Sequence, residues 1–107
     1  MKEVEKLDKI YRISELLTKR FGESTSFMII TRLAEEVGEL AKEVNNFESI
    51  GVKNEKMGFP NKVNLAKEAQ DVIRVVLQLV EKYDVRKEFE NSIEESFKKL
   101  EEKYKSL

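Results

Sequence analysis

The sequence predicts an all-α fold, a four-helix bundle-like single domain that spans residues 1–107. Its length of 107 residues suits one domain. Apolar residues recur at the spacing of helix faces along four stretches. Glu and Lys, which favour helices, dominate the 38% of residues that are charged. Because so short a chain has a large surface for its volume, we expect a homodimer or homotetramer to complete the bundle.

The first two helices are predicted over residues 4–20 and from the serines near position 25 to about Phe47. In the first stretch the apolar residues near helical spacing are Leu7, Ile10, Tyr11, Ile13, Leu17 and Phe21. Gly22 follows and can end this helix. Ser24 or Ser26 can cap the second helix.

A loop is predicted over residues 48–60, which contain two glycines and the only proline. Asn61 or Asn64 can start the third helix, which we expect to run to about Tyr83. Its apolar segment 72–80 is rich in β-branched residues, and a strand is conceivable there. A buried helix is preferred, because the segment continues the helical pattern that precedes it.

The fourth helix is predicted to follow Asp84, which is a candidate cap. Beyond it, apolar residues spaced by three or four form one stripe: Val85, Phe89, Ile93, Phe97, Leu100 and Tyr104. Such a stripe is typical of a helix that packs along one face.

The composition excludes several kinds of chemistry. The chain has no Cys and no His, which removes disulfides, nucleophile–histidine systems and the usual zinc ligand sets. The 20 basic and 21 acidic residues nearly cancel, so we expect neither nucleic acid nor a membrane as a partner. The charged N-terminus lacks the apolar region of a signal peptide, which predicts a cytoplasmic protein.

Helical projection, at roughly 100° per residue, separates the acidic residues of the second and third helices. Glu35 points away from the apolar arc of its helix, Glu36 lies at the edge of that arc, and Glu39 lies one step further round. On the third helix Glu68 projects into the apolar arc, and Asp71 lies just outside it. An ion in such a position is normally paired or bound to a cation, because its desolvation costs several kcal/mol.

Two pairs of carboxylates, Glu36/Glu39 and Glu68/Asp71, have i, i+3 spacing, which places both members on one side of a helix. If the two helices pack antiparallel, the pairs can face each other, and such a cluster persists only with bound cations or with protons taken up. Its hard oxygen ligands suit magnesium or manganese. Two other interpretations stay open. The acids can form an ordinary solvated face, or Glu68 can form a buried salt bridge with Arg32 or a lysine.

These residues resemble the motifs of MazG-like nucleotide pyrophosphohydrolases, Glu-Glu-x-x-Glu on one helix and Glu-x-x-Asp on a later one. The first is Glu35-Glu36-Val37-Gly38-Glu39 and the second is Glu68-Ala69-Gln70-Asp71. The 28 residues between them lie toward the long end of the family's range, as in its dCTP pyrophosphatase-like branch. The resemblance covers about residues 26–104.

The resemblance implies magnesium-dependent hydrolysis of a nucleoside triphosphate to the monophosphate and pyrophosphate, with manganese as a substitute ion. It also implies the catalytic, metal-binding residues, called here the four-carboxylate set: Glu36, Glu39, Glu68 and Asp71. The projection independently selects the same residues.

Substrate contacts are assigned more loosely. Lys99 and Lys53 are candidates for contacting phosphate, and Phe47 for stacking on a base. Two alternatives to nucleoside triphosphate hydrolysis remain. One is the sister activity, phosphoribosyl-ATP pyrophosphohydrolysis. The other is a non-catalytic helical interaction module, in which Glu68 would form a salt bridge and the carboxylates would not converge.

Overall fold

The computed structural model describes residues 2–48 and 59–105, which form four helices without strands. The helices are α1 (Lys2–Phe21), α2 (Ser26–Phe47), α4 (Lys62–Lys82) and α5 (Arg86–Tyr104). This architecture confirms the predicted all-α fold. None of these four helices combines the length and apolarity that a membrane span requires.

The first three helices begin and end where local chemistry allows it. Gly22 ends α1 with a φ of 94°, a left-handed conformation that costs glycine little. The prediction that Ser24 or Ser26 caps α2 is wrong by one residue, because the side chain of Thr25 accepts the backbone N–H of Met28 instead. Asn61 caps α4, which confirms one of the two predicted alternatives.

The turn between α4 and α5 differs from the prediction that Asp84 caps α5. Asp84 has a φ of 53°, so it supplies the left-handed residue of the turn. The N-cap position belongs to Val85, whose side chain makes no capping hydrogen bond. The tight turn is closed by the backbone instead, with the N–H of Val85 donating to the carbonyl of Val80 at 3.0 Å.

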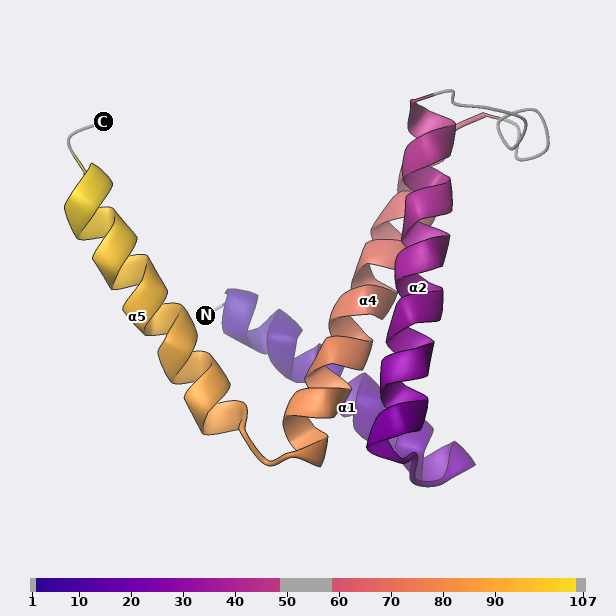
Figure 1. Cartoon of the computed structure of the whole chain (residues 1–107), viewed down its shortest axis with the longest axis horizontal. Helices are drawn as coiled ribbons and strands as arrows, with labels where there is room; N and C mark the ends of the chain where they lie inside the picture. Colours follow the sequence, from indigo (N-terminus) through magenta and orange to yellow (C-terminus); the bar gives the residue numbers. More distant parts are fainter. Residues whose placement is uncertain (1, 49–58, 106–107) are drawn as a thin grey trace.

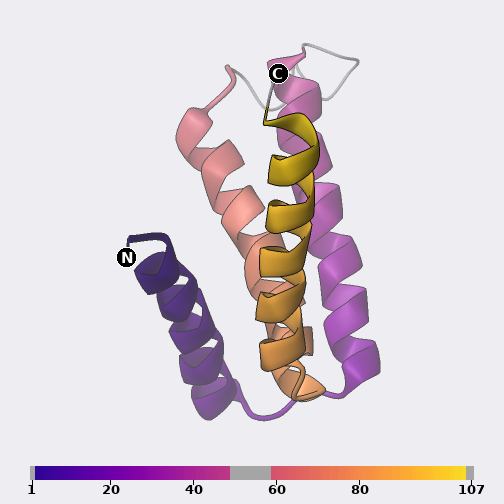
Figure 2. The same ribbon diagram turned by 90° about the vertical axis from the view of Figure 1, so that its left-hand side faces the viewer.

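Helices α2 and α4 form an antiparallel pair, and α1 crosses this pair on one side (Figure 1 and Figure 2). The most deeply buried hydrophobic residues come from these three helices: Tyr11, Ile29, Val75, Leu77 and Val80. Segment 72–80 is helical, which confirms the predicted buried helix and excludes the strand.

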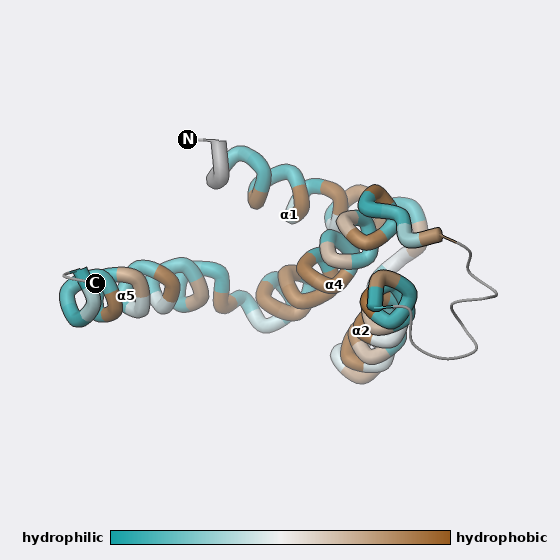
Figure 3. Tube along the Cα trace, turned by 90° about the horizontal axis from the view of Figure 1, so that it is seen from above, coloured by the Kyte–Doolittle hydropathy of each residue, from teal (hydrophilic) through white to brown (hydrophobic). Residues whose placement is uncertain are grey.

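Helix α5 extends away from the other helices as an arm (Figure 1). Among the described helices its backbone approaches α4 alone, at the turn that joins them. Its apolar stripe, which includes Ile93, Phe97 and Leu100, is exposed along a helix that is otherwise mainly hydrophilic (Figure 3). A single chain therefore leaves the fourth side of its bundle open.

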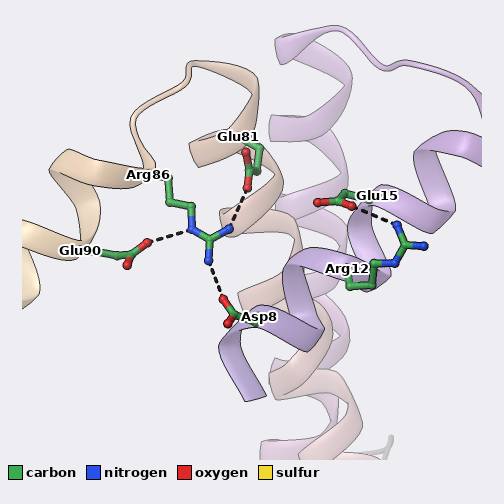
Figure 4. Close-up of polar contacts among 6 residues, drawn as sticks. All are labelled: Asp8, Arg12, Glu15, Glu81, Arg86 and Glu90. Atoms are coloured by element: carbon green, nitrogen blue, oxygen red, sulfur yellow. Dashed lines mark hydrogen bonds and ion pairs between the residues drawn. The ribbon is translucent and has the colours of Figure 1, made fainter. Parts of the chain in front are cut away.

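Arg86, in the first turn of α5, joins the arm to the other helices (Figure 4). Its guanidinium donates to Asp8 of α1 at 2.6 Å and to Glu90 of α5 at 2.8 Å. It also lies 3.6 Å from Glu81 of α4 and over the ring of Tyr11, 3.9 Å from the ring centroid. The charges around Arg86 raise its pKa, chiefly through the hydrogen bond to Glu90. This cluster fixes the direction in which the arm begins.

Candidate metal centre

Three carboxylates meet between α2 and α4 and form what we call the acidic triad. It consists of Glu36, Glu68 and Asp71, each of which offers one oxygen that lies within 4.8 Å of the others. All three side chains are half-buried. Glu36 comes from α2, and the other two come from α4 at i, i+3 spacing. The antiparallel packing of the two helices brings these faces together.

Glu68 is the member of the triad whose environment opposes its charge most. Partial burial raises its pKa above the ordinary glutamate value, and the neighbouring charges of Asp71, Glu36 and Glu39 raise it further. Lys67 acts in the opposite direction but ranks last among these causes. The site therefore favours either a proton or a cation beside Glu68.

Counter-charges within the chain offset only part of the triad. Lys67 forms an ion pair with Asp71 at 2.6 Å. Within the described ranges, neither Glu36 nor Glu68 has a cationic partner. The alternative of a Glu68–Arg32 salt bridge is not formed. The guanidinium of Arg32 donates to the Oε1 atom of Gln78 at 3.3 Å and to the Oγ atom of Ser24 at 3.5 Å.

Glu39 belongs to the four-carboxylate set but lies outside the triad. Its side chain is exposed and forms an ion pair with Lys42 at 3.2 Å. It is nevertheless near enough for its charge to raise the pKa of Glu68. Glu35, on the side of α2 that the projection assigned to solvent, is exposed.

The triad offers a donor set that fits a hard divalent cation. Its ligand atoms are carboxylate oxygens, which magnesium, calcium and manganese prefer. Two of its members lack an ion-pair partner among the described residues, so a bound cation would replace repulsion between carboxylates by attraction. The arrangement can hold a metal ion and, through it, a polyphosphate.

The candidate substrate residues are more scattered. Phe47 is half-buried at the end of α2, about three helical turns from Glu36. Lys99 is exposed on the outer part of the α5 arm, which does not approach α2 within one chain. Lys53 lies outside the described residues.

Sequence reasoning missed a group of polar residues beside the triad. Arg32, Arg74 and Gln78 line a pocket of about 250 Å³ together with hydroxyl groups that include Ser24. Arg74 and Gln78 are both half-buried. The spacing could have indicated this group, because Arg32 precedes Glu36 by four residues and Arg74 follows Asp71 by three.

Comparison with known families identifies a match. The model of a family described as the MazG nucleotide pyrophosphohydrolase domain matches residues 24–107. The matched span contains α2, α4 and α5, and with them the whole four-carboxylate set. No curated protein and no solved structure matches the chain.

Proposed function

The chain belongs to the MazG nucleotide pyrophosphohydrolase family, and we propose that it converts an NTP or dNTP to the monophosphate and pyrophosphate with Mg²⁺, for which Mn²⁺ can substitute. The proposal treats residues 1–107 as one catalytic domain. Its main support is the acidic triad, whose oxygens lie within 4.8 Å of one another inside the matched span.

The proposed metal ligands are the whole four-carboxylate set. Glu39 joins the triad by releasing Lys42, a step that costs little because an exposed ion pair is worth about 0–1 kcal/mol. Glu68 is the ligand that gains most from the ion, since its carboxylate is partly desolvated and has no cationic partner in the described part of the chain.

The proposed reaction requires mainly positioning and charge stabilisation, which carboxylates on two rigid helices can provide. Bound Mg²⁺ would offset the charge of the triphosphate and polarise the α-phosphorus. A carboxylate oxygen of the set accepts a hydrogen bond from the attacking water and orients it toward that phosphorus. The water oxygen forms the new bond to phosphorus, and the proton that it loses passes to this carboxylate. The bond from phosphorus to the α,β-bridging oxygen breaks, and pyrophosphate leaves.

We also propose that the working protein is a homodimer or homotetramer. The open side of the single chain and the exposed apolar stripe of α5 support this. A second copy of the chain carries the same apolar stripe, so two arms can cover each other by a symmetric contact.

The two alternative functions differ in how well they agree with the geometry of the triad. The interaction module requires a Glu68 salt bridge and separated carboxylates, and neither agrees with the geometry of the triad. Phosphoribosyl-ATP is a nucleotide that the same carboxylates could hydrolyse at the corresponding phosphorus, so it belongs in any substrate test.

The test is a screen of the common NTPs and dNTPs, with phosphoribosyl-ATP included, in the presence of Mg²⁺ or of a chelator. We expect at least one nucleotide to yield pyrophosphate and the monophosphate, identified by ³¹P NMR, and the chelator to stop the reaction. Release of orthophosphate, or no metal-dependent product from any of these nucleotides, would refute the proposal.

A further inference from the structure

The pocket missed by sequence reasoning adjoins the acidic triad; we call it the arginine pocket. It lies between α1, α2 and α4, and its volume is about 250 Å³. Arg32 lies one turn from Glu36 on α2, and Arg74 lies one turn from Asp71 on α4, axial offsets of roughly 6 Å and 4.5 Å. The pocket therefore lies about one helical turn from the triad along both helices. Drug-sized ligands need roughly 300–1,000 Å³, so this pocket suits one part of a nucleotide.

The polar groups that line the arginine pocket are mainly hydrogen-bond donors. A guanidinium group has five N–H donors and no acceptor. Arg32 donates to the Oε1 atom of Gln78 at 3.3 Å, which leaves the amide nitrogen of Gln78 available to donate. Arg74 has no hydrogen-bond or ion-pair partner within the described residues. No carboxylate from this described part lines the pocket, and its side-chain acceptors are hydroxyl groups and the Oε1 atom of Gln78, which already accepts from Arg32.

We propose that the arginine pocket binds the base of the substrate nucleotide and selects a 6-oxopurine, guanine or hypoxanthine, over adenine. The inference rests on the proposed function, because it gives the triphosphate to the acidic triad and the base to the pocket. Guanine presents two acceptors, O6 and N7, which a guanidinium binds in a bidentate manner. Adenine presents its N6 amino group at the same edge, where it would face another donor.

The remaining wall of the pocket favours a ring over a phosphate group. Leu17 and Phe21 contribute apolar surface to the lining. A phosphate group would leave this surface unused. The two interpretations predict different behaviour when the base alone is changed.

The first experiment compares ITP with ATP, which share the ribose and the phosphates and differ at the edge that the arginines would contact. We expect kcat/KM for ITP and GTP to exceed that for ATP by roughly tenfold, within the range that one bidentate base contact provides. In Arg74→Met, which keeps an apolar stem but no donors, kcat/KM should fall severalfold more for ITP and GTP than for ATP, so that most of this preference is lost. The control is Arg12→Met, because Arg12 is exposed and lies outside the pocket.

A substrate analogue gives the same information without mutation. Replacing GTP by 7-deaza-GTP removes one of the two acceptors, and we expect the rate advantage over ATP to fall severalfold with the wild-type protein. Equal rates for ITP and ATP would overturn the assignment. An Arg74→Met variant that lowers both rates alike would also overturn it, because that is the behaviour of a phosphate contact.

Calorimetric titration with IMP and AMP in the absence of metal separates this inference from the proposed function. Tighter binding of IMP by a protein that releases no pyrophosphate would refute the proposed function and support the pocket assignment. Equal binding of the two monophosphates would overturn the pocket assignment, whatever the activity.

Discussion

Glu68 places a carboxylate at a half-buried position of α4, where an apolar side chain would lose less hydration free energy. Its neighbours raise its pKa, and its charge has no partner among the described residues. Burying an unpaired charge destabilises a fold. Under the proposed function, a bound cation would offset this cost.

The first prediction at this scale concerns activity. Glu68→Gln should lower magnesium-dependent pyrophosphate release by at least 100-fold, because a neutral amide cannot replace a charged ligand of the ion. A coupled pyrophosphate assay measures the effect. The matched control is Glu94→Gln, an exposed glutamate on α5, which should keep the wild-type rate. Full activity in Glu68→Gln would remove Glu68 from the mechanism.

The second prediction concerns stability without metal. Because the pKa of Glu68 is raised in the folded state, the folded protein binds this proton more tightly than the unfolded chain does. The contribution of Glu68 to stability is therefore present below the ordinary glutamate pKa of 4.5 and is lost as the pH rises through the raised pKa. Glu68→Gln should then have a higher Tm than the wild type at pH 7.

Thermal unfolding in chelator at several pH values measures this difference, which should shrink as the pH falls below 4.5. Adding Mg²⁺ at pH 7 is the control, since it should raise the Tm of the wild type more than that of the variant. A wild-type protein that is as stable as Glu68→Gln at pH 7 without metal would contradict the prediction.

Which side of a helix a residue occupies is a local property, so the sequence could predict it. The period of the helix alone selected Glu36 and Glu68 and set Glu35 aside. The pairing of Arg32 with Gln78, 46 positions later in the chain, depends on how α2 and α4 align. Periodicity can place Arg32 and Arg74 one turn from the acidic residues of their own helices. It contains no information about how the two helices align, so it could not show that both arginines line one pocket.

The helices themselves could be predicted, because apolar spacing and turn residues are properties of short stretches of sequence. The helix termini were harder to predict, because neighbouring Ser and Thr residues can all cap a helix and the backbone geometry selects among them. Asp84 was expected to cap α5, but the tight turn places it in the left-handed conformation instead. The outward direction of α5 could not be predicted, because it follows from that turn and from the contacts of Arg86.

Gly22 provides a test of how α1 ends. Its φ of 94° strains any residue with a Cβ atom, so Gly22→Ala should lower the free energy of unfolding by about 1 kcal/mol. Urea denaturation measures the change. The matched control is Gly38→Ala inside α2, where an added Cβ meets open space. This substitution should raise the free energy of unfolding by about 0.5–1 kcal/mol. Equal effects of the two substitutions would show that the left-handed turn does not matter.

Arg86 provides a test of how α5 is held. Arg86→Met keeps much of the stem but removes the charge that joins Asp8, Glu81 and Glu90. We therefore expect the free energy of unfolding to fall by about 1 kcal/mol. The loss should be smaller at high salt, which screens these pairs. Arg12→Met removes one exposed ion pair (Figure 4) and should change stability by less than about 0.5 kcal/mol. Losses of equal size would contradict the role assigned to Arg86.

The whole molecule is too extended to be a self-contained bundle. Its radius of gyration is 17.0 Å, whereas a compact domain of 107 residues has roughly 13 Å. Three residues of the α5 stripe, Ile93, Phe97 and Leu100, are 47%, 62% and 54% exposed. Exposed apolar surface of this extent is typical of an interface.

Light scattering tests the assembly that this surface implies. We expect the mass of a dimer or tetramer for the wild type and a shift toward monomer for Phe97→Glu, which places a charge in the middle of the stripe. Lys87→Glu, which also changes charge on α5 but lies at an exposed position near its start, should keep the wild-type mass. A monomeric wild type would contradict the proposed assembly.

The central claim is that carboxylates of α2 and α4 jointly bind the divalent ion on which nucleotide hydrolysis depends. Crystals grown with Mn²⁺ and a non-hydrolysable triphosphate analogue test it, with diffraction data collected at the manganese absorption edge. We predict an anomalous peak coordinated by oxygens of Glu36, Glu68 and Asp71 and by the analogue's phosphates. A peak elsewhere, or one from which Glu68 is turned away, would contradict the claim.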